Sequence, residues 1–382
     1  MKLAFCLFKY FPYGGLQRDF LELATICLQR GHEVDVFTME WVGPVPEGIR
    51  LHIVRTSGFT NHGRNVYFAN KVLPLLNHDA YDAVIGFNKM PGLDVYYAAD
   101  PCYQEKARNT YQPKLGPLYC LTPRFRQYVA MEEAVFTPKV QTQILQLSAY
   151  QQQAFVRYYN TPRERFHLLP PGIRLDRIPQ ASHAPARSQL RRELSLSDSH
   201  LLLVMVGSRA KGKGLDRSLR ALAALPLDLR QRTWMIVLGE NKSKPFLRLA
   251  ARLGIGGKLL MLGGREDIPR YLLGADQFIH PAYSENTGTV ILEAMACGLP
   301  VLATDVCGYA SHVVDAQAGE IIPSPFDQEA LNRTLASMLT SPLRQAWARN
   351  GISYVMNLDL GRRWHMAATI IESTKKGMAC DR

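Results

Sequence analysis

The sequence lacks any long hydrophobic run. Among its 382 residues, no stretch of roughly 18 or more is uniformly apolar. The N-terminus, MKLAFCLFKYFP, has neither a long apolar core nor a small-residue cleavage site. We therefore expect no membrane-spanning helix and no secretory signal, and we predict a protein that stays in the cytosol.

Cysteine is scarce, and its spacing shows no pairs. The seven cysteines lie at positions 6, 27, 102, 120, 297, 307 and 380, and no two of them form a Cys-x-x-Cys pair. An odd number without such pairs indicates neither a disulfide framework nor a structural zinc site. We expect reduced thiols, mostly in the core, and no bound metal.

Acidic residues are outnumbered by basic ones. The chain has 33 acidic and 45 basic residues, which gives a net charge of +12 and favours an anionic partner. No helix-turn-helix, zinc-finger or RNP-like sequence accompanies this charge. We therefore do not expect nucleic acid to be the partner.

Short β-rich runs alternate with helical patterns, as in parallel sheets with crossover helices. A chain of this length that is 47% hydrophobic holds more than one core usually contains, which favours two α/β domains. Strands are predicted in the first half at Leu3–Phe8, Glu33–Thr38, Ala83–Phe87 and Gln143–Leu147. Strands are predicted in the second half at Leu201–Val206, Trp234–Leu238, Leu259–Leu262, Gln277–His280 and Val301–Thr304.

A polar stretch that contains prolines, from Asn160 to Asp198, interrupts this pattern, with Pro170-Pro171-Gly172 as the predicted hinge. The sequence thus predicts two Rossmann-like domains. Ligands of open α/β sheets bind at the carboxyl ends of the strands. The glycine-bearing loops that follow the first strand of each half are therefore candidate sites.

The stretch Ser284 to Val301 combines two carboxylates with a helix start. The run Thr287-Gly288-Thr289 opens the predicted helix, whose first amides have no intrahelical partner and can point at a phosphate or a sugar oxygen. Glu285 lies on the loop side of this anion site. Glu293 lies about one turn further along, where it can reach a vicinal diol such as a ribose. Carboxylates flanking free amides suit a nucleotide sugar.

This stretch places seven residues between Glu285 and Glu293, and it resembles the E-x7-E motif of retaining GT-B glycosyltransferases of family 4. The segments KYFPYGGLQRDF, GFNKMPGLDVYYAAD, PPGIRLDR and KGKGLDRSL extend the resemblance from Met1 to about Phe326. Within the family these motifs are most similar to lipopolysaccharide core glycosyltransferases that add the first outer-core hexose.

The resemblance implies a GT-B fold, in which two Rossmann-like domains face each other across a cleft. We expect residues 1–168 to form the acceptor-side domain, with a C-terminal helix at about 362–382 packing on it, and residues 169–361 to bind the nucleotide sugar. The implied enzyme is a retaining, metal-independent hexosyltransferase without a cofactor. It transfers a hexose from a UDP-sugar, with UDP-glucose as the expected co-substrate, to a heptose of the lipopolysaccharide inner core. No single motif separates glucose from galactose or N-acetylgalactosamine.

In the first half, the loop Tyr13-Gly14-Gly15-Leu16 precedes the predicted helix Gln17–Gln29. It is not a G-x-G-x-x-G loop, which counts against a nicotinamide-binding dehydrogenase. In the glycosyltransferase frame, the amide of Gly15 meets the donor phosphate and Asp19 is a catalytic residue on the acceptor side. The alternative for Asp19 is a solvated first-turn acid favoured by the helix dipole.

In the second half, the loop from Gly207 to Gly214 carries three cations ahead of the helix Leu215–Ala223. Such cations can neutralise a leaving diphosphate. Lys213 matches the lysine of the family, whereas Ser208 takes the position of the family's arginine. We therefore expect Arg209, or Arg177 from the hinge, to supply the guanidinium.

The remaining site predictions also rest on the resemblance. The donor is expected to contact Glu285, Asn286, Thr287, Gly288, Thr289, Glu293 and Arg265, the last beside the uracil. The resemblance places Asp100 at the cleft wall, where it is expected near the transferred sugar. An aspartate after buried residues is also costly unless it is paired. Acceptor contacts are expected from His62, Arg64 and Lys89, for which ordinary surface positions are the alternative.

The region 102–130 interleaves basic and aromatic residues. It contains Lys106, Arg108, Lys114, Arg124 and Arg126, with tyrosines at positions 103, 111, 119 and 128 and a single acid, Glu105. This composition suits the surface of an anionic membrane, where each cation contributes about 1 kcal/mol. We predict peripheral binding to the inner face of the inner membrane, with a solvated basic insertion as the alternative.

Two other functions stay open. A UDP-N-acetylhexosamine 2-epimerase shares the architecture but needs an acid/base pair acting on the sugar ring and no acceptor. A non-catalytic lipid- or nucleic-acid-binding protein of the same fold would bind its ligand without turnover.

Overall fold

The computed structural model of the chain describes residues 1–12, 14–76, 80–110, 115–174, 178, 183–240 and 242–374. The chain divides into two compact units: unit 1 is Met1–Pro170 with Arg362–Arg382, and unit 2 is Pro171–Gly361. The division falls inside the Pro170-Pro171-Gly172 segment, two residues beyond the boundary expected at 168.

Unit 1 contains a parallel seven-stranded sheet with the order β5-β3-β1-β6-β7-β8-β9. Its strands are β1 (Lys2–Cys6), β3 (Glu33–Thr38), β5 (Ile49–Ile53), β6 (Ala83–Gly86), β7 (Val95–Ala98), β8 (Gln143–Gln146) and β9 (Phe166–Leu168). A separate pair joins β2 (Lys9–Tyr10) to β4 (Glu40–Trp41). The order runs outward from β1 in both directions, so the strand sequence reverses between β1 and β6.

Six helices of unit 1 are described, together with short 3-10 turns. The helices are α1 (Gly15–Gln29), α2 (Asn61–Val72), α3 (Tyr103–Thr110), α5 (Pro123–Phe136), α6 (Gln152–Tyr159) and α16 (Arg362–Ser373). The 3-10 turns are Leu73–Leu75, η2 (Pro117–Leu121), Ala149–Gln151 and Arg163–Arg165.

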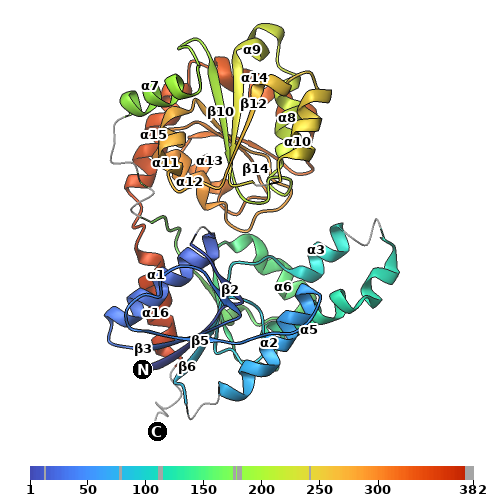
Figure 1. Cartoon of the computed structure of the whole chain (residues 1–382), viewed down its shortest axis with the longest axis vertical. Helices are drawn as coiled ribbons and strands as arrows, with labels where there is room; N and C mark the ends of the chain where they lie inside the picture. Colours follow the sequence, from blue (N-terminus) through green and yellow to red (C-terminus); the bar gives the residue numbers. More distant parts are fainter. Residues whose placement is uncertain are drawn as a thin grey trace. The chain divides into compact units, whose positions relative to one another are not determined.

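Alternating residues of the central strands enter two cores in unit 1, as expected for a sheet covered on both faces. Leu3 and Phe5 of β1 pack with residues of α1 and α16, whereas Ala4 and Cys6 pack with residues of α2, α5 and α6. Figure 1 shows α1 and α16 together on one face of the sheet, although they come from opposite ends of the sequence.

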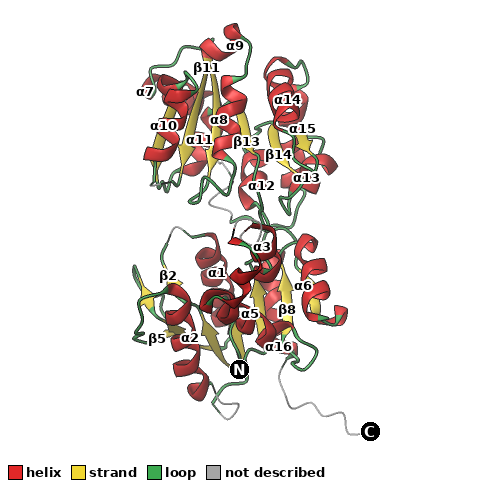
Figure 2. Cartoon of the chain, turned by 90° about the vertical axis from the view of Figure 1, so that its right-hand side faces the viewer, coloured by secondary structure: helices red, strands yellow, loops and turns green. Residues whose placement is uncertain are grey.

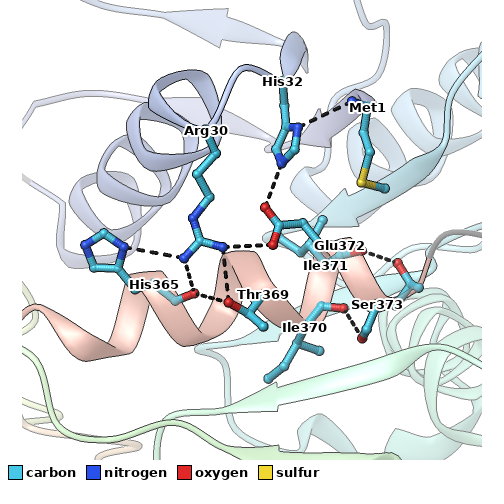
Figure 3. Close-up of polar contacts among 10 residues, drawn as sticks. Met1, Arg30, His32, His365, Thr369, Ile370, Ile371, Glu372 and Ser373 are labelled. Atoms are coloured by element: carbon cyan, nitrogen blue, oxygen red, sulfur yellow. Dashed lines mark hydrogen bonds and ion pairs between the residues drawn. The ribbon is translucent and has the colours of Figure 1, made fainter.

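Polar contacts hold α16 against the end of α1 (Figure 3). The Arg30 guanidinium donates to the Glu372 carboxylate at 2.9 Å, and His32 Nε2 lies 2.8 Å from the other carboxylate oxygen. The amino group of Met1 lies 3.3 Å from His32 Nδ1. The C-terminal helix is thereby part of the packed structure of unit 1.

Unit 2 contains a parallel six-stranded sheet with the order β12-β11-β10-β13-β14-β15, flanked by helices (Figure 2). Its strands are β10 (Leu201–Val206), β11 (Thr233–Leu238), β12 (Leu259–Gly263), β13 (Gln277–His280), β14 (Val301–Thr304) and β15 (Gly319–Ile322). Its helices are α7 (His183–Glu193), α8 (Leu215–Ala223), α9 (Leu227–Arg232), α10 (Lys244–Arg252), α11 (Ile268–Gly274), α12 (Thr289–Ala296), α13 (Ala310–Asp315), α14 (Gln328–Thr340) and α15 (Arg344–Met356), with a 3-10 turn at Gly256–Lys258.

The second sheet is also buried on both faces. Leu202 and Val204 of β10 contribute to one core with α7, α11, α12 and α13, and Leu203 and Met205 contribute to the other with α8, α10 and α14. The predicted α/β class is therefore confirmed for both halves. None of the helices described is long and apolar enough to cross a membrane.

Candidate active site

Two loops meet in unit 2 where the strand order reverses. β10 and β13 are neighbours in the sheet, and the chain passes through β11 and β12 on the other side of β10 before it returns. Ligands of open α/β sheets bind outside the carboxyl ends of the strands at such a switch point. Residues 207–214 follow β10 and residues 281–288 follow β13, so both predicted donor loops start at this point.

A glycine allows these two loops to touch. Gly214 has a φ of 81° at the start of α8, and a Cβ atom there would lie 2.0 Å from the carbonyl oxygen of Pro281. The amide of Tyr283 donates to the Gly212 carbonyl at 2.9 Å. Because a side chain at position 214 would collide with backbone, glycine is required to keep Lys213 beside the second loop.

Lys213, Glu285 and His280 form a cluster at this junction. The Lys213 ammonium directly contacts Glu285 Oε2, and His280 Nε2 lies 3.7 Å from the same oxygen. His280 is fully buried at the end of β13, whereas the side chains of Lys213 and Glu285 retain 22% and 14% exposure. The lysine and the carboxylate are thus shielded but still reachable by a ligand.

Burial dominates the electrostatics of the cluster. It lowers the pKa of Lys213 to about 8, with smaller effects from the Cys307 thiol, which raises it, and from Arg209, which lowers it. The Glu285 contact favours the charged ammonium. Burial, and then the charge of Lys213, holds the pKa of His280 well below its usual value. At neutral pH the cluster therefore carries a cation and a neutral imidazole.

Helix α12 begins on a left-handed glycine directly after this cluster. Gly288 has a φ of 80°, and no side chain caps the first turn of the helix. The Thr287 carbonyl is held by the amide of Tyr309 at 2.8 Å, and the Glu285 carbonyl by the amide of Gly308 at 3.2 Å. This arrangement leaves the helix start without a side-chain acceptor, as an anion site requires.

The two buried polar residues near this helix start are Asn286 and Glu293, which are 7% and 6% exposed. Glu293 lies in α12, about one turn beyond its start, as predicted. Burial and the nearby Glu293 carboxylate raise the pKa of the Cys297 thiol. Glu293 is therefore a shielded acid.

The other donor candidates lie at the surface of unit 2. Arg209 is exposed in the loop after β10, and Arg265 is exposed with its guanidinium 5.4 Å from the centre of the Tyr271 ring. Arg177 lies outside the described residues. The described loop cations are therefore Arg209, Lys211 and Lys213, of which Lys213 contacts Glu285.

Three residues that support the loops were not predicted. Glu240, 8% exposed, accepts from the amides of Ala210 and Lys242 at 2.9 and 2.8 Å. Arg217 lies 3.6 Å from the ring centres of both Tyr283 and Phe326 and donates to the Pro281 and Ala282 carbonyls at 3.1 and 2.8 Å. His280 was predicted only as the last residue of the strand Gln277–His280, although a polar residue that ends an apolar strand was a usable signal.

In unit 1 the predicted glycine loop precedes α1 at the reversal between β1 and β6. Gly15 opens the helix and is exposed, and a Cβ atom there would meet nothing within 4 Å. At Gly14, by contrast, a Cβ atom would lie 1.8 Å from Gln17 Oε1 and 2.8 Å from the Phe11 ring. A side chain at position 14 would therefore have to displace the Gln17 amide and the Phe11 ring, whereas position 15 is open to a ligand.

Asp19 is held inside unit 1. Its Oδ2 lies 3.7 Å from Arg363 Nη1 of α16, and its side chain is 19% exposed. Burial raises the pKa of Asp19, against the opposing effects of Arg363, Tyr97, Arg18 and Trp364. The alternative of a solvated first-turn acid does not fit these surroundings.

Lys89 belongs to a buried hydrogen-bond network in unit 1. Its ammonium donates to the Glu132 carboxylate at 2.5 Å and to the Pro101 carbonyl at 2.7 Å. Glu132 is fully buried and also accepts from the Tyr159 hydroxyl and from the amides of Tyr103 and Gln104. The charge of Lys89 is thus already balanced within unit 1, which does not favour a role in acceptor binding.

The remaining acceptor-side candidates are more open. His62 and Arg64 are half-buried on the first turn of α2, and the His62 ring lies 6.3 Å from that of Tyr128. Asp100 is exposed just after β7, so it carries no burial cost that a partner must offset.

The region 102–130 forms α3, η2 and the start of α5. Arg108, Arg124 and Arg126 are exposed, Lys106 is half-buried, and Tyr111 and Lys114 lie outside the described residues. Tyr103 and Tyr119 face inward: their hydroxyls lie 2.9 Å apart beside Phe125. The exposed apolar residues are instead leucines, Leu115 (61%), Leu118 (70%) and Leu121 (58%).

Known proteins share both the sequence and the fold. The family model "Glycosyl transferases group 1" matches residues 186–354. The chain is 45% identical over 372 residues to lipopolysaccharide glucosyltransferase WaaG of Escherichia coli (strain K12), covering 97% of this chain and 98% of that protein. It is 28% identical to a D-inositol 3-phosphate glycosyltransferase of Xylanimonas cellulosilytica, over 87% and 85% of the two chains.

The solved structures agree with this relationship. The crystal structure of WaaG matches with a TM-score of 0.90 and 44% identity, over 97% of this chain and 99% of that one. Anabaena Alr3699/HepE, solved with UDP and glucose, matches with a TM-score of 0.74 at 19% identity, over 98% and 100% of the chains, and shows the fold alone. The chain therefore has a GT-B fold and belongs to the group 1 glycosyltransferases, as a WaaG-like hexosyltransferase.

Proposed function

We propose that this enzyme transfers a hexose from a UDP-sugar to a heptose of the lipopolysaccharide inner core, with UDP-glucose as the donor. The observation that carries the proposal is the 45% identity, over 97% of the chain, to a protein named lipopolysaccharide glucosyltransferase. The shielded Lys213–Glu285 contact at the switch point supports it, because a diphosphate and a sugar need a cation and a hydrogen-bond acceptor side by side.

On the donor side, Lys213 stabilises the charge that develops on the leaving diphosphate, together with a guanidinium from Arg209 or Arg177. The Gly15 amide also meets the donor phosphate. The amides at 288–290 and the Glu285 side chain hold the sugar, with Asn286, Thr287 and Thr289 around it. Glu293 accepts from the ribose hydroxyls, and Arg265 lies beside the uracil.

Transfer keeps the anomeric configuration through front-face attack. The acceptor hydroxyl oxygen bonds to the anomeric carbon while the bond from that carbon to the diphosphate breaks, and the departing phosphate oxygen takes the hydroxyl proton. No metal takes part, because protein cations compensate the leaving charge. Asp19 and Asp100 serve the acceptor and the transferred sugar, and His62 and Arg64 contact the acceptor.

We further propose that the enzyme works at the cytoplasmic face of the inner membrane and binds anionic lipid through region 102–130. The support is the proximity in sequence of the exposed Arg124 and Arg126 to the exposed Leu118 and Leu121. Cations contribute to binding at an anionic surface, and exposed apolar side chains add buried area.

The assay compares three donors, each with and without an acceptor. Purified protein is incubated with UDP-glucose, UDP-galactose or UDP-N-acetylgalactosamine, with heptose-terminated lipopolysaccharide or without acceptor, and both the lipid and the sugar are analysed. We expect acceptor-dependent release of UDP with α-linked glucose on the lipid. An epimerised sugar formed without acceptor, or binding without turnover, would replace the proposal by one of the two alternative functions.

A further inference from the structure

The His280 side chain has unmet hydrogen-bonding capacity inside unit 2. The residue is fully buried, and neither Nδ1 nor Nε2 has a hydrogen-bond partner among the residues that the structure describes. Its ring lies 5.7 Å from the Phe278 ring and nearly parallel to it. Leaving a buried polar group unpaired costs about 1–3 kcal/mol. Such a cost suggests that the two ring nitrogens of His280 find a partner in another state of the enzyme.

The nearest group that the imidazole could bond is the Glu285 carboxylate. The distance of 3.7 Å from Nε2 to Oε2 is too long for a hydrogen bond but within reach of a small side-chain rotation. The same oxygen is occupied by the Lys213 ammonium. The Cys307 thiol lies 3.9 Å from the His280 carbonyl oxygen. Glu285 Oε2 is thus in contact with the Lys213 ammonium and 3.7 Å from the neutral His280 imidazole.

A bound diphosphate must compete for Lys213. When the ammonium turns to the diphosphate, Glu285 loses its counter-charge while it remains 14% exposed. A shielded carboxylate without a partner is strongly destabilising. Either a proton or a new hydrogen-bond donor must then compensate it.

We propose that His280 is a positioning residue. It hydrogen-bonds to the Glu285 carboxylate when the donor diphosphate binds the Lys213 ammonium in place of that carboxylate. Nε2–H then donates to Oε2, which keeps the carboxylate ionised and turns Oε1 toward a hydroxyl of the transferred sugar. This inference rests on the proposed roles of Lys213 and Glu285 in donor binding. It assigns to His280 the task of holding Glu285 in its anionic, sugar-accepting form.

The test measures proton uptake on donor binding. UDP-glucose is titrated into the full-length protein by calorimetry near pH 6.5, in buffers of different ionisation enthalpy. The donor is a diphosphate diester with no ionisation near this pH, and Lys213 is already protonated there. We expect little uptake by the wild type, because Glu285 stays ionised throughout.

His280→Phe keeps a ring of similar size but removes the donor. We expect this variant to bind UDP-glucose about 10- to 100-fold more weakly, because a hydrogen bond to a charged group is lost. It should take up about one proton per site as Glu285 becomes protonated, so that its affinity falls as the pH rises. His280→Gln, which retains an N–H donor, should restore the low proton uptake.

A spectroscopic measurement keeps the inference testable if His280→Phe does not fold. In the wild type with isotope-labelled histidine, the His280 ring N–H signal should move downfield on addition of UDP-glucose, and it should not move in Glu285→Gln. An unchanged ring signal in the wild type, or equal proton uptake by wild type and His280→Phe, overturns the inference. If the wild type binds no UDP-glucose at all, the proposed function itself fails.

Discussion

The Nη1 atom of Arg363 lies 3.7 Å from the Oδ2 atom of Asp19. The positive charge of a residue in the last helix thus compensates the negative charge of an acid in the first helix. Arg363 is fully buried and also donates to the Pro170 carbonyl at 3.1 Å. The C-terminal helix therefore sets the charge environment of a proposed catalytic residue. Its removal would expose one face of the first sheet and leave Asp19 without this partner.

Arg363→Met should destabilise unit 1 by about 3–5 kcal/mol, because it leaves Asp19 shielded without its counter-charge. Chemical denaturation monitored by circular dichroism measures the loss. Adding Asp19→Asn should recover part of it, since no uncompensated charge remains. A single variant as stable as wild type would show that the contact contributes nothing.

The same pair predicts a pH dependence of stability. Burial raises the pKa of Asp19 and Arg363 opposes this, so removing Arg363 raises the pKa further. An acid whose pKa is higher in the folded state binds a proton on folding, and stability then falls as pH rises through the interval above about 3.9. We expect Arg363→Met to regain stability relative to wild type as the pH is lowered from about 7 to about 5. A constant difference in unfolding free energy over this range would contradict the assignment.

Glu293→Ala should weaken UDP binding by about 1.5–3 kcal/mol, because a hydrogen bond to a charged group is lost. Calorimetric titration with UDP measures the change. Glu329→Ala provides the matched control, since it removes an exposed glutamate from another helix of unit 2, α14. Unchanged UDP affinity in Glu293→Ala would remove this residue from the ribose site.

Lys213→Ala should lower turnover by about 100- to 1,000-fold and affect acceptor binding much less, because the ammonium acts where charge builds on the leaving diphosphate. The exposed Lys211 of the same loop gives the control variant Lys211→Ala. Since the pKa of Lys213 is lowered to about 8, kcat/KM should fall as the pH rises through this value and the cation is lost. Lys213→Arg should abolish this fall of kcat/KM at high pH, because the guanidinium stays charged.

Turnover should also survive EDTA. If EDTA abolished the activity and magnesium restored it, the metal-free account would be wrong.

Replacing Lys106, Arg108, Lys114, Arg124 and Arg126 by glutamine should release the protein from vesicles that contain anionic lipid. The attraction is screened over about 8 Å at physiological salt, so wild-type binding should also weaken as salt rises. Vesicle sedimentation measures both effects, and activity on a soluble acceptor fragment should survive.

The control for charge alone replaces five exposed cations of unit 2, Lys244, Arg248, Arg252, Arg333 and Arg349, by glutamine. This variant should still sediment with the vesicles. If both variants are released equally, net charge rather than region 102–130 determines binding, and the region is a solvated insertion.

The sequence alone determined most of the buried parallel strands and the loops that follow them, although the buried central strand Val95–Ala98 was not predicted. Glu33–Thr38, Leu201–Val206, Gln277–His280 and Val301–Thr304 have the predicted bounds. Central strands of parallel sheets are covered on both faces, so they appear as short continuous apolar runs that can be recognised locally. The Gly288 helix start was equally visible, because its signal lies within a few neighbouring residues.

The edge and short strands were not predicted. Ile49–Ile53 is partly exposed at the edge of the first sheet and alternates with polar residues, and Phe166–Leu168 has only three residues. Gly319–Ile322 begins with a glycine and a glutamate, which are depleted in strands. Such strands are stabilised by pairing with a neighbour distant in the sequence, which their own composition does not encode.

Only the tertiary structure decided which polar residues meet. Gly214 must be glycine because of a carbonyl at Pro281, Arg363 balances Asp19 from the other end of the chain, and His280 lies beside Glu285 without a bond. Each relationship depends on a distance between residues that are not local in the chain or on the burial of a side chain. Sequence patterns report periodicity along one element, whereas packing between elements sets the charge, the burial and the unmet hydrogen bonds on which the chemistry depends.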